Sequence, residues 1–127
     1  MLYTKTTRGS VDEVTQRLAA TAIANKFGVL GEHDLKERMA AKGVEFGTEC
    51  RVLEVCNPAQ AKKVLEADMS ISTALPCRIS IYEDRGKVTV STLKPTALLR
   101  LFGNPGLEPV AREVEDTILR IIDTACE

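Results

Sequence analysis

The sequence predicts an α+β fold, in which a mixed β-sheet of about five strands is covered by helices. Runs with strand or helix periodicity follow one another in the order β-α-β-α-β-α-β-β-α-α. Two of the strand-like runs are separated only by a tight turn, which places an antiparallel hairpin in the sheet. The chain has 127 residues, 44% of them apolar, which suits one domain spanning residues 1–127 around one hydrophobic core.

The first strand is expected at residues 2–6, and a helix follows it. Ser10 and Glu13 have the spacing of a capping box, in which the hydroxyl and the carboxylate accept hydrogen bonds from backbone N–H groups. Gly28 is expected to end this helix. Its apolar stripe has helical spacing and consists of Val11, Val14, Leu18, Ala22, Ile23 and Phe27.

A second, short strand is expected at residues 29–33. Asp34 is a suitable N-cap for a short helix that carries Leu35 and Met39. That helix ends at Lys42-Gly43, and residues 43–49 are expected to form a loop.

The third strand is expected at residues 50–56. Asn57 as N-cap and Pro58 at the first helical position then begin a helix that runs to about residue 68. Residues 70–76 are expected to form a loop.

The hairpin consists of strands at residues 77–83 and 87–93, joined by Asp84-Arg85-Gly86. Alternation predicts that one face of the first strand carries Cys77, Ile79 and Ile81.

A short helix at residues 96–102 is expected to end at the break over residues 103–106. The last helix is expected at residues 108–125, and its inner face carries Val110, Val114, Ile118, Ile121, Ile122 and Ala125.

Four large apolar residues fall within the short helix and cannot all lie on one stripe. Either the last helix covers them, or an exposed remainder marks a subunit contact, for which a closed two-fold homodimer is the commonest arrangement. These residues are Leu98, Leu99, Leu101 and Phe102.

Charge and composition exclude several classes of partner. The net charge is −1 and no basic run is present, so nucleic acid is not an expected partner. With three Phe, two Tyr and no Trp, the chain also lacks the aromatic residues of a base-stacking surface. No signal peptide or membrane-spanning run is visible, so we expect no membrane association. Four cysteines without a secretory signal indicate free thiols in the cytoplasm.

Cys56 is the first candidate for unusual chemistry. It directly precedes a predicted helix, whose N-terminal dipole stabilises a thiolate and lowers the thiol pKa. The alternative is a buried, inert cysteine that serves as a small hydrophobic residue.

Cys77 follows Pro76 at the start of a strand. If this strand neighbours the one that ends at Cys56, the two sulfurs can approach each other as a redox pair. The chain has no C-x-x-C motif, so the common dithiol arrangement is absent.

Glu54 alternates with Cys56, so both project from the same face, together with Cys50 and Val52. In a cavity the Glu54 carboxyl would have a raised pKa and could act as an acid or base. The alternative is an exposed glutamate on a solvated sheet face.

His33, the only histidine, could join Cys56 and Cys77 as a weak set of soft-metal ligands, with Glu54 beside them. Their spacing does not match a zinc signature, so we expect no metal site. Arg78 could hold an anion, although a surface arginine is the ordinary interpretation. The sequence contains no G-x-S-x-G, P-loop or dinucleotide-binding motif, and no cofactor is expected.

Two cysteine-centred phrases resemble the bacterial and archaeal domain-of-unknown-function family number 302. They are Glu54-Val55-Cys56-Asn57-Pro58 and Leu75-Pro76-Cys77-Arg78-Ile79. Further similarity covers nearly the whole chain and includes Phe27-Gly28-Val29-Leu30, Asp34-Leu35, Lys42-Gly43, Ala61, Leu65 and the segment 82–90.

This resemblance implies a small α+β domain that forms a homodimer, and it implies no established activity. The positions that match the family's motif are Glu54, Cys56, Asn57, Pro58, Pro76 and Cys77, whereas Cys50 and Cys126 lie outside it. We expect a non-enzymatic homodimeric module that binds a small ligand or a protein. The alternative is a thiol redox or soft-metal-handling protein that uses Cys56 and Cys77 with Glu54.

Overall fold

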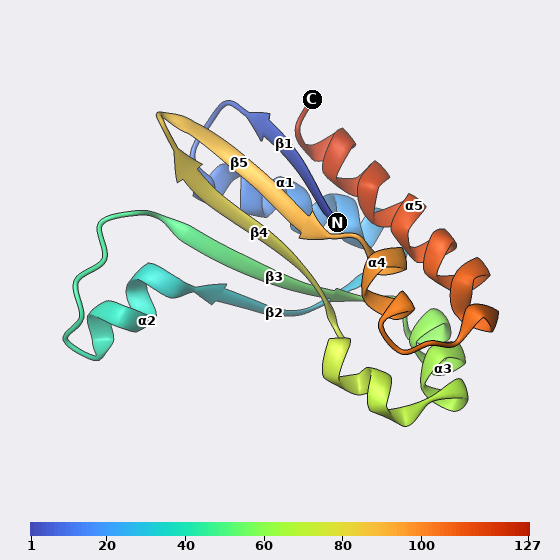
Figure 1. Ribbon diagram of the computed structural model, residues 1–127. Helices are drawn as coiled ribbons and strands as arrows, with labels where there is room; N and C mark the ends of the chain where they lie inside the picture. Colours follow the sequence, from blue (N-terminus) through green and yellow to red (C-terminus); the bar gives the residue numbers. More distant parts are fainter.

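A computed structural model describes residues 1–127 and contains one five-stranded β-sheet in the order β1-β5-β4-β3-β2 (Figure 1). The strands are β1 (Leu2–Thr7), β2 (Gly28–Asp34), β3 (Cys50–Cys56), β4 (Cys77–Asp84) and β5 (Lys87–Leu93). The α-helices are α1 (Val11–Ala24), α2 (Leu35–Ala41), α3 (Pro58–Ala67), α4 (Pro95–Arg100) and α5 (Glu108–Ala125). The predicted α+β class, strand number and element order are confirmed.

The sheet is antiparallel throughout, where a mixed sheet was expected. A parallel pair needs a crossover that carries the chain back to the opposite end of the sheet. Here Val55, near the end of β3, pairs with Cys77 at the start of β4. The segment between these strands therefore leaves and re-enters the sheet at the same end, and the strand direction reverses.

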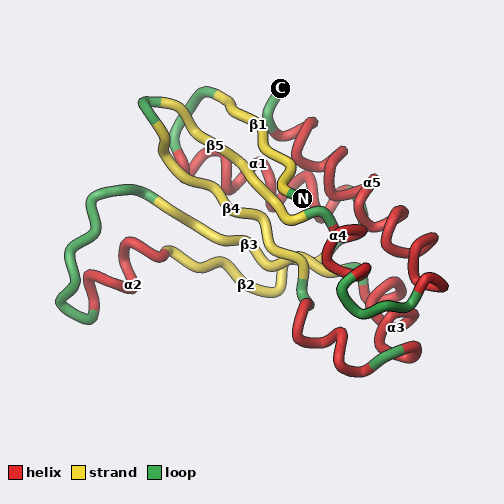
Figure 2. The backbone as a smooth tube through the Cα atoms, in the orientation of Figure 1, coloured by secondary structure: helices red, strands yellow, loops and turns green.

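Helices α1 and α5 lie together on one face of the sheet, while neither covers the opposite face (Figures 1 and 2). We call this opposite side the open face. The main core lies between the sheet and these two helices, and its fully buried members include Leu18, Leu53, Ile79, Ile118 and Ile121. The predicted inner face of the last helix is confirmed, since five of its residues are buried and Val114 is partly buried.

The N-terminus of α1 has the predicted cap, because the Ser10 hydroxyl accepts a hydrogen bond from the Glu13 N–H at 3.1 Å. The Glu13 carboxylate accepts a hydrogen bond from the Ser10 hydroxyl, not from a backbone N–H as expected. Ile23 was expected in the apolar stripe but is exposed. Thr15 is buried instead, and its hydroxyl donates to the Val11 carbonyl at 2.7 Å.

Helix α1 ends before Gly28, contrary to the prediction. Lys26 has a left-handed backbone with φ of 65°, and its N–H donates to the Ile23 carbonyl. The Phe27 N–H donates to the Ala22 carbonyl, which completes a Schellman motif. Both Phe27 and Ala22 are buried, so their apolar contact offsets the cost of a lysine in this conformation. Gly28 is the first residue of β2.

Helix α2 and the loop after it form an arm that projects from the end of β2 and β3 (Figure 1). Asp34 caps the helix as predicted, accepting a hydrogen bond from the Glu37 N–H at 3.0 Å. No residue of α2 is buried, so Leu35 and Met39 add little to the core.

Helix α3 begins as predicted, with Pro58 at its first position and Asn57 as N-cap. The expected loop at residues 70–76 is largely a 3₁₀ helix, η1 (Met69–Ala74), which Asp68 caps through the Ser70 N–H. Ile71 is fully buried in a second core cluster and holds this helix in place. A cis peptide bond joins Leu75 to Pro76.

The β4–β5 hairpin is confirmed. Its two turn residues, Arg85 and Gly86, have φ values of 53° and 79°, which a tight hairpin turn of this hand requires. Helix α4 matches the short helix predicted after the hairpin, and a 3₁₀ turn, η2 (Pro105–Leu107), leads into α5. None of the helices has the length and hydropathy needed to cross a bilayer.

Candidate functional site

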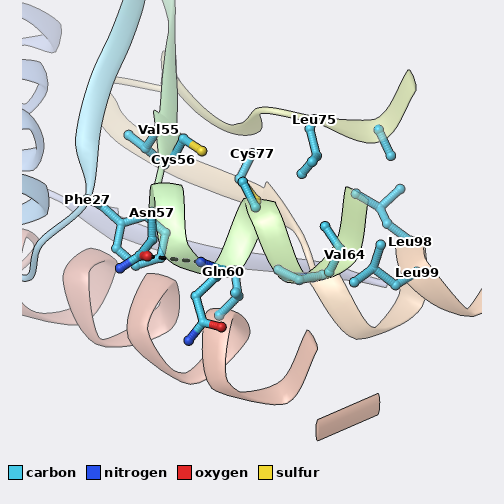
Figure 3. A pocket seen from close by; sticks show the side chains of 14 residues that line it. Phe27, Val55, Cys56, Asn57, Gln60, Val64, Leu75, Cys77, Leu98 and Leu99 are labelled. Atoms are coloured by element: carbon cyan, nitrogen blue, oxygen red, sulfur yellow. Dashed lines mark hydrogen bonds between the residues drawn. The ribbon is translucent and has the colours of Figure 1, made fainter. Parts of the chain in front are cut away.

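Cys56 and Cys77 lie on neighbouring strands, as the redox hypothesis required. Cys77 pairs with Val55, so Cys56 is the next residue along β3 after the partner of Cys77. Both residues are free thiols, and both line a pocket of about 40 Å³ at the end of the sheet (Figure 3). We call this the cysteine pocket.

The cysteine pocket is small and mainly apolar. Its walls include Phe27, Val64 and Leu99, and its volume is that of one or two water molecules, too little for an organic ligand. Asn57 and Gln60 are its polar residues. The Asn57 side chain accepts a hydrogen bond from the Gln60 N–H at 3.2 Å (Figure 3), so it caps α3. Asn57 and Pro58 therefore account for the start of a helix.

The surroundings of the two thiols oppose ionisation. Burial raises the pKa of Cys77 to about 11, and the neighbouring Cys56 adds to this shift. Burial also raises the pKa of Cys56, so the predicted depression is wrong. Cys56 does precede a helix, but the N–H groups of Gln60 and Ala61 already donate hydrogen bonds to the side chain and the carbonyl of Asn57. These two donors are therefore not free to stabilise a Cys56 thiolate. Apolar surroundings therefore outweigh the helix dipole.

Glu54 lies on the open face, because its strand neighbours Leu53 and Val55 point into the core. One carboxylate oxygen, Oε1, is 2.6 Å from His33 Nε2, and the other, Oε2, is 3.6 Å from Arg78 Nε. The hydrogen bond with His33 is the main cause that holds the pKa of Glu54 below its usual value, and the nearby Arg78 guanidinium adds to it. The raised pKa that a cavity would have caused is therefore not found, and Glu54 does not line the cysteine pocket.

Gly31 makes room for the contact between His33 and Glu54, and the sequence analysis missed it. A β-bulge between Val29 and Gly31 places Gly31 opposite Glu54. A Cβ atom at Gly31 would lie 2.8 Å from Glu54 Oε1 and 3.3 Å from His33 Nε2. The signal in the sequence is a glycine inside a strand, which often marks a bulge or a close approach.

The weak metal candidates are not brought together. His33 contacts Glu54 on the open face, whereas Cys56 and Cys77 line the cysteine pocket. Nowhere does the structure gather three or more His, Cys, Asp or Glu residues in a group that could hold a metal ion.

A larger groove lies at the end of the open face, beside α4 and the segment that contains η1. It has a volume of about 530 Å³, and we call it the sheet groove. Its floor includes Val52, Ser80 and Ser91, which are neighbours on β3, β4 and β5. Its walls are apolar and include Leu75, Pro76, Leu98, Leu101 and Phe102.

Three predicted site residues, Pro76, Cys77 and Arg78, line the sheet groove. Cys77 also lines the cysteine pocket, so it lies between the two hollows together with Leu75 and Leu98. Arg78 is the only residue with a charged side chain among those that line the groove, and it links the groove to Glu54.

The groove wall at α4 is fixed to α5 by a buried carboxylate that the sequence analysis did not single out. Glu115 on α5 accepts hydrogen bonds from the Thr96 N–H at 3.1 Å and the Thr96 hydroxyl at 2.6 Å. Of the four apolar residues near α4, Leu99 is buried and Leu101 is 74% exposed. The last helix therefore covers part of this set, and part remains exposed.

These features define an α+β domain with helices on one sheet face and a mainly apolar groove on the other. The chain belongs to the family described as Domain of unknown function DUF302, whose model matches residues 3–125. It is similar to a protein of known structure, an uncharacterized conserved protein DUF302 from Bacillus stearothermophilus, with 30% sequence identity and a TM-score of 0.93. That similarity covers 99% of this chain and 98% of the other. No curated protein matches the sequence. The family resemblance is confirmed.

Proposed function

We propose that this chain is a non-enzymatic binding module that holds a small, largely apolar molecule in the sheet groove. The observation that carries this proposal is the composition of the groove. Its volume of about 530 Å³ falls within the range of small-molecule sites, roughly 300–1,000 Å³. Apolar walls surround a few residues with polar side chains, which are Thr73, Arg78, Ser80, Ser91 and Thr92. Sites for small organic molecules have this combination.

The titratable groups around the groove favour binding over catalysis. The raised pKa of Cys77 keeps its thiol protonated near neutral pH, which makes it a weak nucleophile. Glu54 is held by His33 and Arg78, and its lowered pKa makes it a weak base. We therefore favour a binding module over the alternative of thiol redox or metal chemistry.

We also propose that the module forms a two-fold homodimer in the cytoplasm. Large apolar side chains are exposed around the mouth of the groove, where Leu2, Leu93 and Leu101 are 63%, 42% and 74% exposed. Exposed apolar groups gathered in one region are typical of subunit contacts. Four free thiols suit a reducing compartment.

Binding of the neutral fluorescent probe N-phenyl-1-naphthylamine tests the groove. The chain has no tryptophan, so probe fluorescence is free of an intrinsic indole signal. We expect saturable binding to the native protein, lost in Ser80→Phe, which fills the groove floor. The matched control is Thr6→Phe, which adds the same ring to β1 outside the groove. Circular dichroism checks that both variants are folded. Equal probe binding by the two variants would overturn the proposal.

A further inference from the structure

Arg78 places a positive charge at one position of the sheet groove. The other residues that line the groove have apolar or uncharged polar side chains, and no carboxylate is among them. A ligand in the groove therefore meets one cationic group and a mainly apolar surface. We infer that the ligand is an amphiphilic monoanion, with an apolar chain and a carboxylate head group that Arg78 binds. This inference rests on the proposed function and adds the chemical class of the ligand.

The contact between Arg78 and Glu54 leaves the guanidinium available. Arg78 Nε is 3.6 Å from Glu54 Oε2, which is beyond hydrogen-bond distance, and the arginine side chain is 68% exposed. Glu54 makes its close contact with His33 instead, at 2.6 Å. A guanidinium carries five N–H donors in a planar fork that matches a carboxylate, so Arg78 can receive a bidentate head group.

The surfaces next to Arg78 suit the rest of such a molecule. Ser80 is two residues along β4 on the same face, so its hydroxyl lies beside the head-group position. Leu75, Leu98 and Phe102 provide apolar walls, against which the apolar chain of the ligand is removed from water. A cationic head group of equal size would meet Arg78 as a like charge.

Glu54 competes with the proposed head group for Arg78. In the free protein the Glu54 carboxylate already provides Arg78 with an opposite charge. Removing that charge by Glu54→Gln frees the guanidinium and should strengthen anion binding. Arg78→Gln, by contrast, should weaken anion binding. Opposite effects of these two neighbouring substitutions separate recognition of the head group from a general loss of structure.

The test displaces N-phenyl-1-naphthylamine with decanoate or with decylammonium, which have the same chain length and opposite charges. We expect decanoate to displace the probe at a concentration about tenfold lower than decylammonium does, since hydrogen bonds to charged groups have about this effect on affinity. Arg78→Gln should abolish the preference, and Glu54→Gln should increase decanoate affinity severalfold. The control is Arg85→Gln, because Arg85 is 96% exposed at the hairpin turn and should leave the preference unchanged.

Equal displacement by the two amphiphiles would overturn the inference and leave the proposed groove function intact. A preference for decanoate that survives Arg78→Gln would also overturn it. If the probe does not bind to the native protein, the proposed function itself fails. Circular dichroism of each variant confirms that the fold is retained.

Discussion

The Nε2 atom of His33 lies 2.6 Å from the Oε1 atom of Glu54, across two neighbouring strands on the open face. This contact holds the Glu54 carboxylate between an imidazole and the guanidinium of Arg78. It explains why Glu54 is a charged group with fixed partners and not a free acid or base. The charge distribution at the sheet groove therefore depends on His33, a residue of β2 that does not line the groove.

Protein stability should fall in acid because of Glu54. Its pKa in the folded protein is lowered below the unfolded value of about 4.3. The stabilisation that Glu54 contributes is therefore fully present above the unfolded pKa, and it is lost as the pH falls through the pKa of the folded protein. Urea unfolding of the native protein and of Glu54→Gln between pH 3 and pH 7 measures this difference. The variant should lose less stability in acid, and parallel pH profiles would contradict the assignment.

Gly31→Ala should destabilise the protein by about 1 kcal/mol, the lower end of the range for overpacking. The added methyl group would meet Glu54 Oε1 at 2.8 Å, and the carboxylate must leave His33 to avoid it. In a Glu54→Ala background the contact at 2.8 Å is absent, and the His33 ring, 3.3 Å from the added methyl group, has lost its partner and can shift, so the same substitution should be much less destabilising. Chemical denaturation of the native protein, the two single variants and the double variant gives the coupling free energy between the two positions. Additive effects would show that Gly31 does not accommodate the contact.

The Cys77 thiol should react slowly in the native protein. With a pKa of about 11, roughly one Cys77 thiol in a thousand is ionised at pH 8. Labelling by iodoacetamide, resolved by peptide mass spectrometry, should accelerate about tenfold for each pH unit from 8 to 10, since the thiolate is the reacting species. The unfolded protein in guanidinium chloride is the control, in which the labelling rate should be half-maximal near pH 8.5 and level off above that pH. A plateau below pH 8 in the native protein would contradict the burial of this thiol.

Leu101→Lys should convert the proposed homodimer to a monomer. Leu101 is 74% exposed on the rim of the sheet groove, and a charge there would be desolvated in a subunit contact. Sedimentation velocity of the native protein and the variant measures the change. Ile23→Lys is the matched control, because Ile23 is 64% exposed on α1, on the other side of the sheet. A monomeric native protein, or a dimer that persists in Leu101→Lys, would exclude this contact.

The features predicted well from the sequence are those that short-range chemistry determines. Ser10, Asp34 and Asn57 cap helices because a side-chain oxygen accepts a hydrogen bond from the N–H three residues later, whatever the rest of the fold does. The hairpin turn at Arg85 and Gly86 is equally local. The all-antiparallel sheet was missed because strand direction depends on where the chain returns, which no local pattern encodes.

The candidate site was predicted only where its residues are adjacent in the sequence. Pro76, Cys77 and Arg78 are adjacent in sequence, and all three line the sheet groove. Val52, Ser80 and Ser91 form its floor only because β3, β4 and β5 are neighbours in the sheet. The activation of Cys56 that the thiol-redox alternative required is not found, because its apolar surroundings come from α4 and other distant segments.

The segment that leaves the sheet after Cys56 and returns at Cys77 allows the groove to vary independently of the sheet. Because both ends of this segment lie at the same end of the sheet, insertions or deletions within it do not change the register of β3 against β4. This segment supplies Leu75 and Pro76, while the floor residues belong to the strands. In related chains this wall of the groove can therefore change in length or shape while the pairing of β3 with β4 is kept.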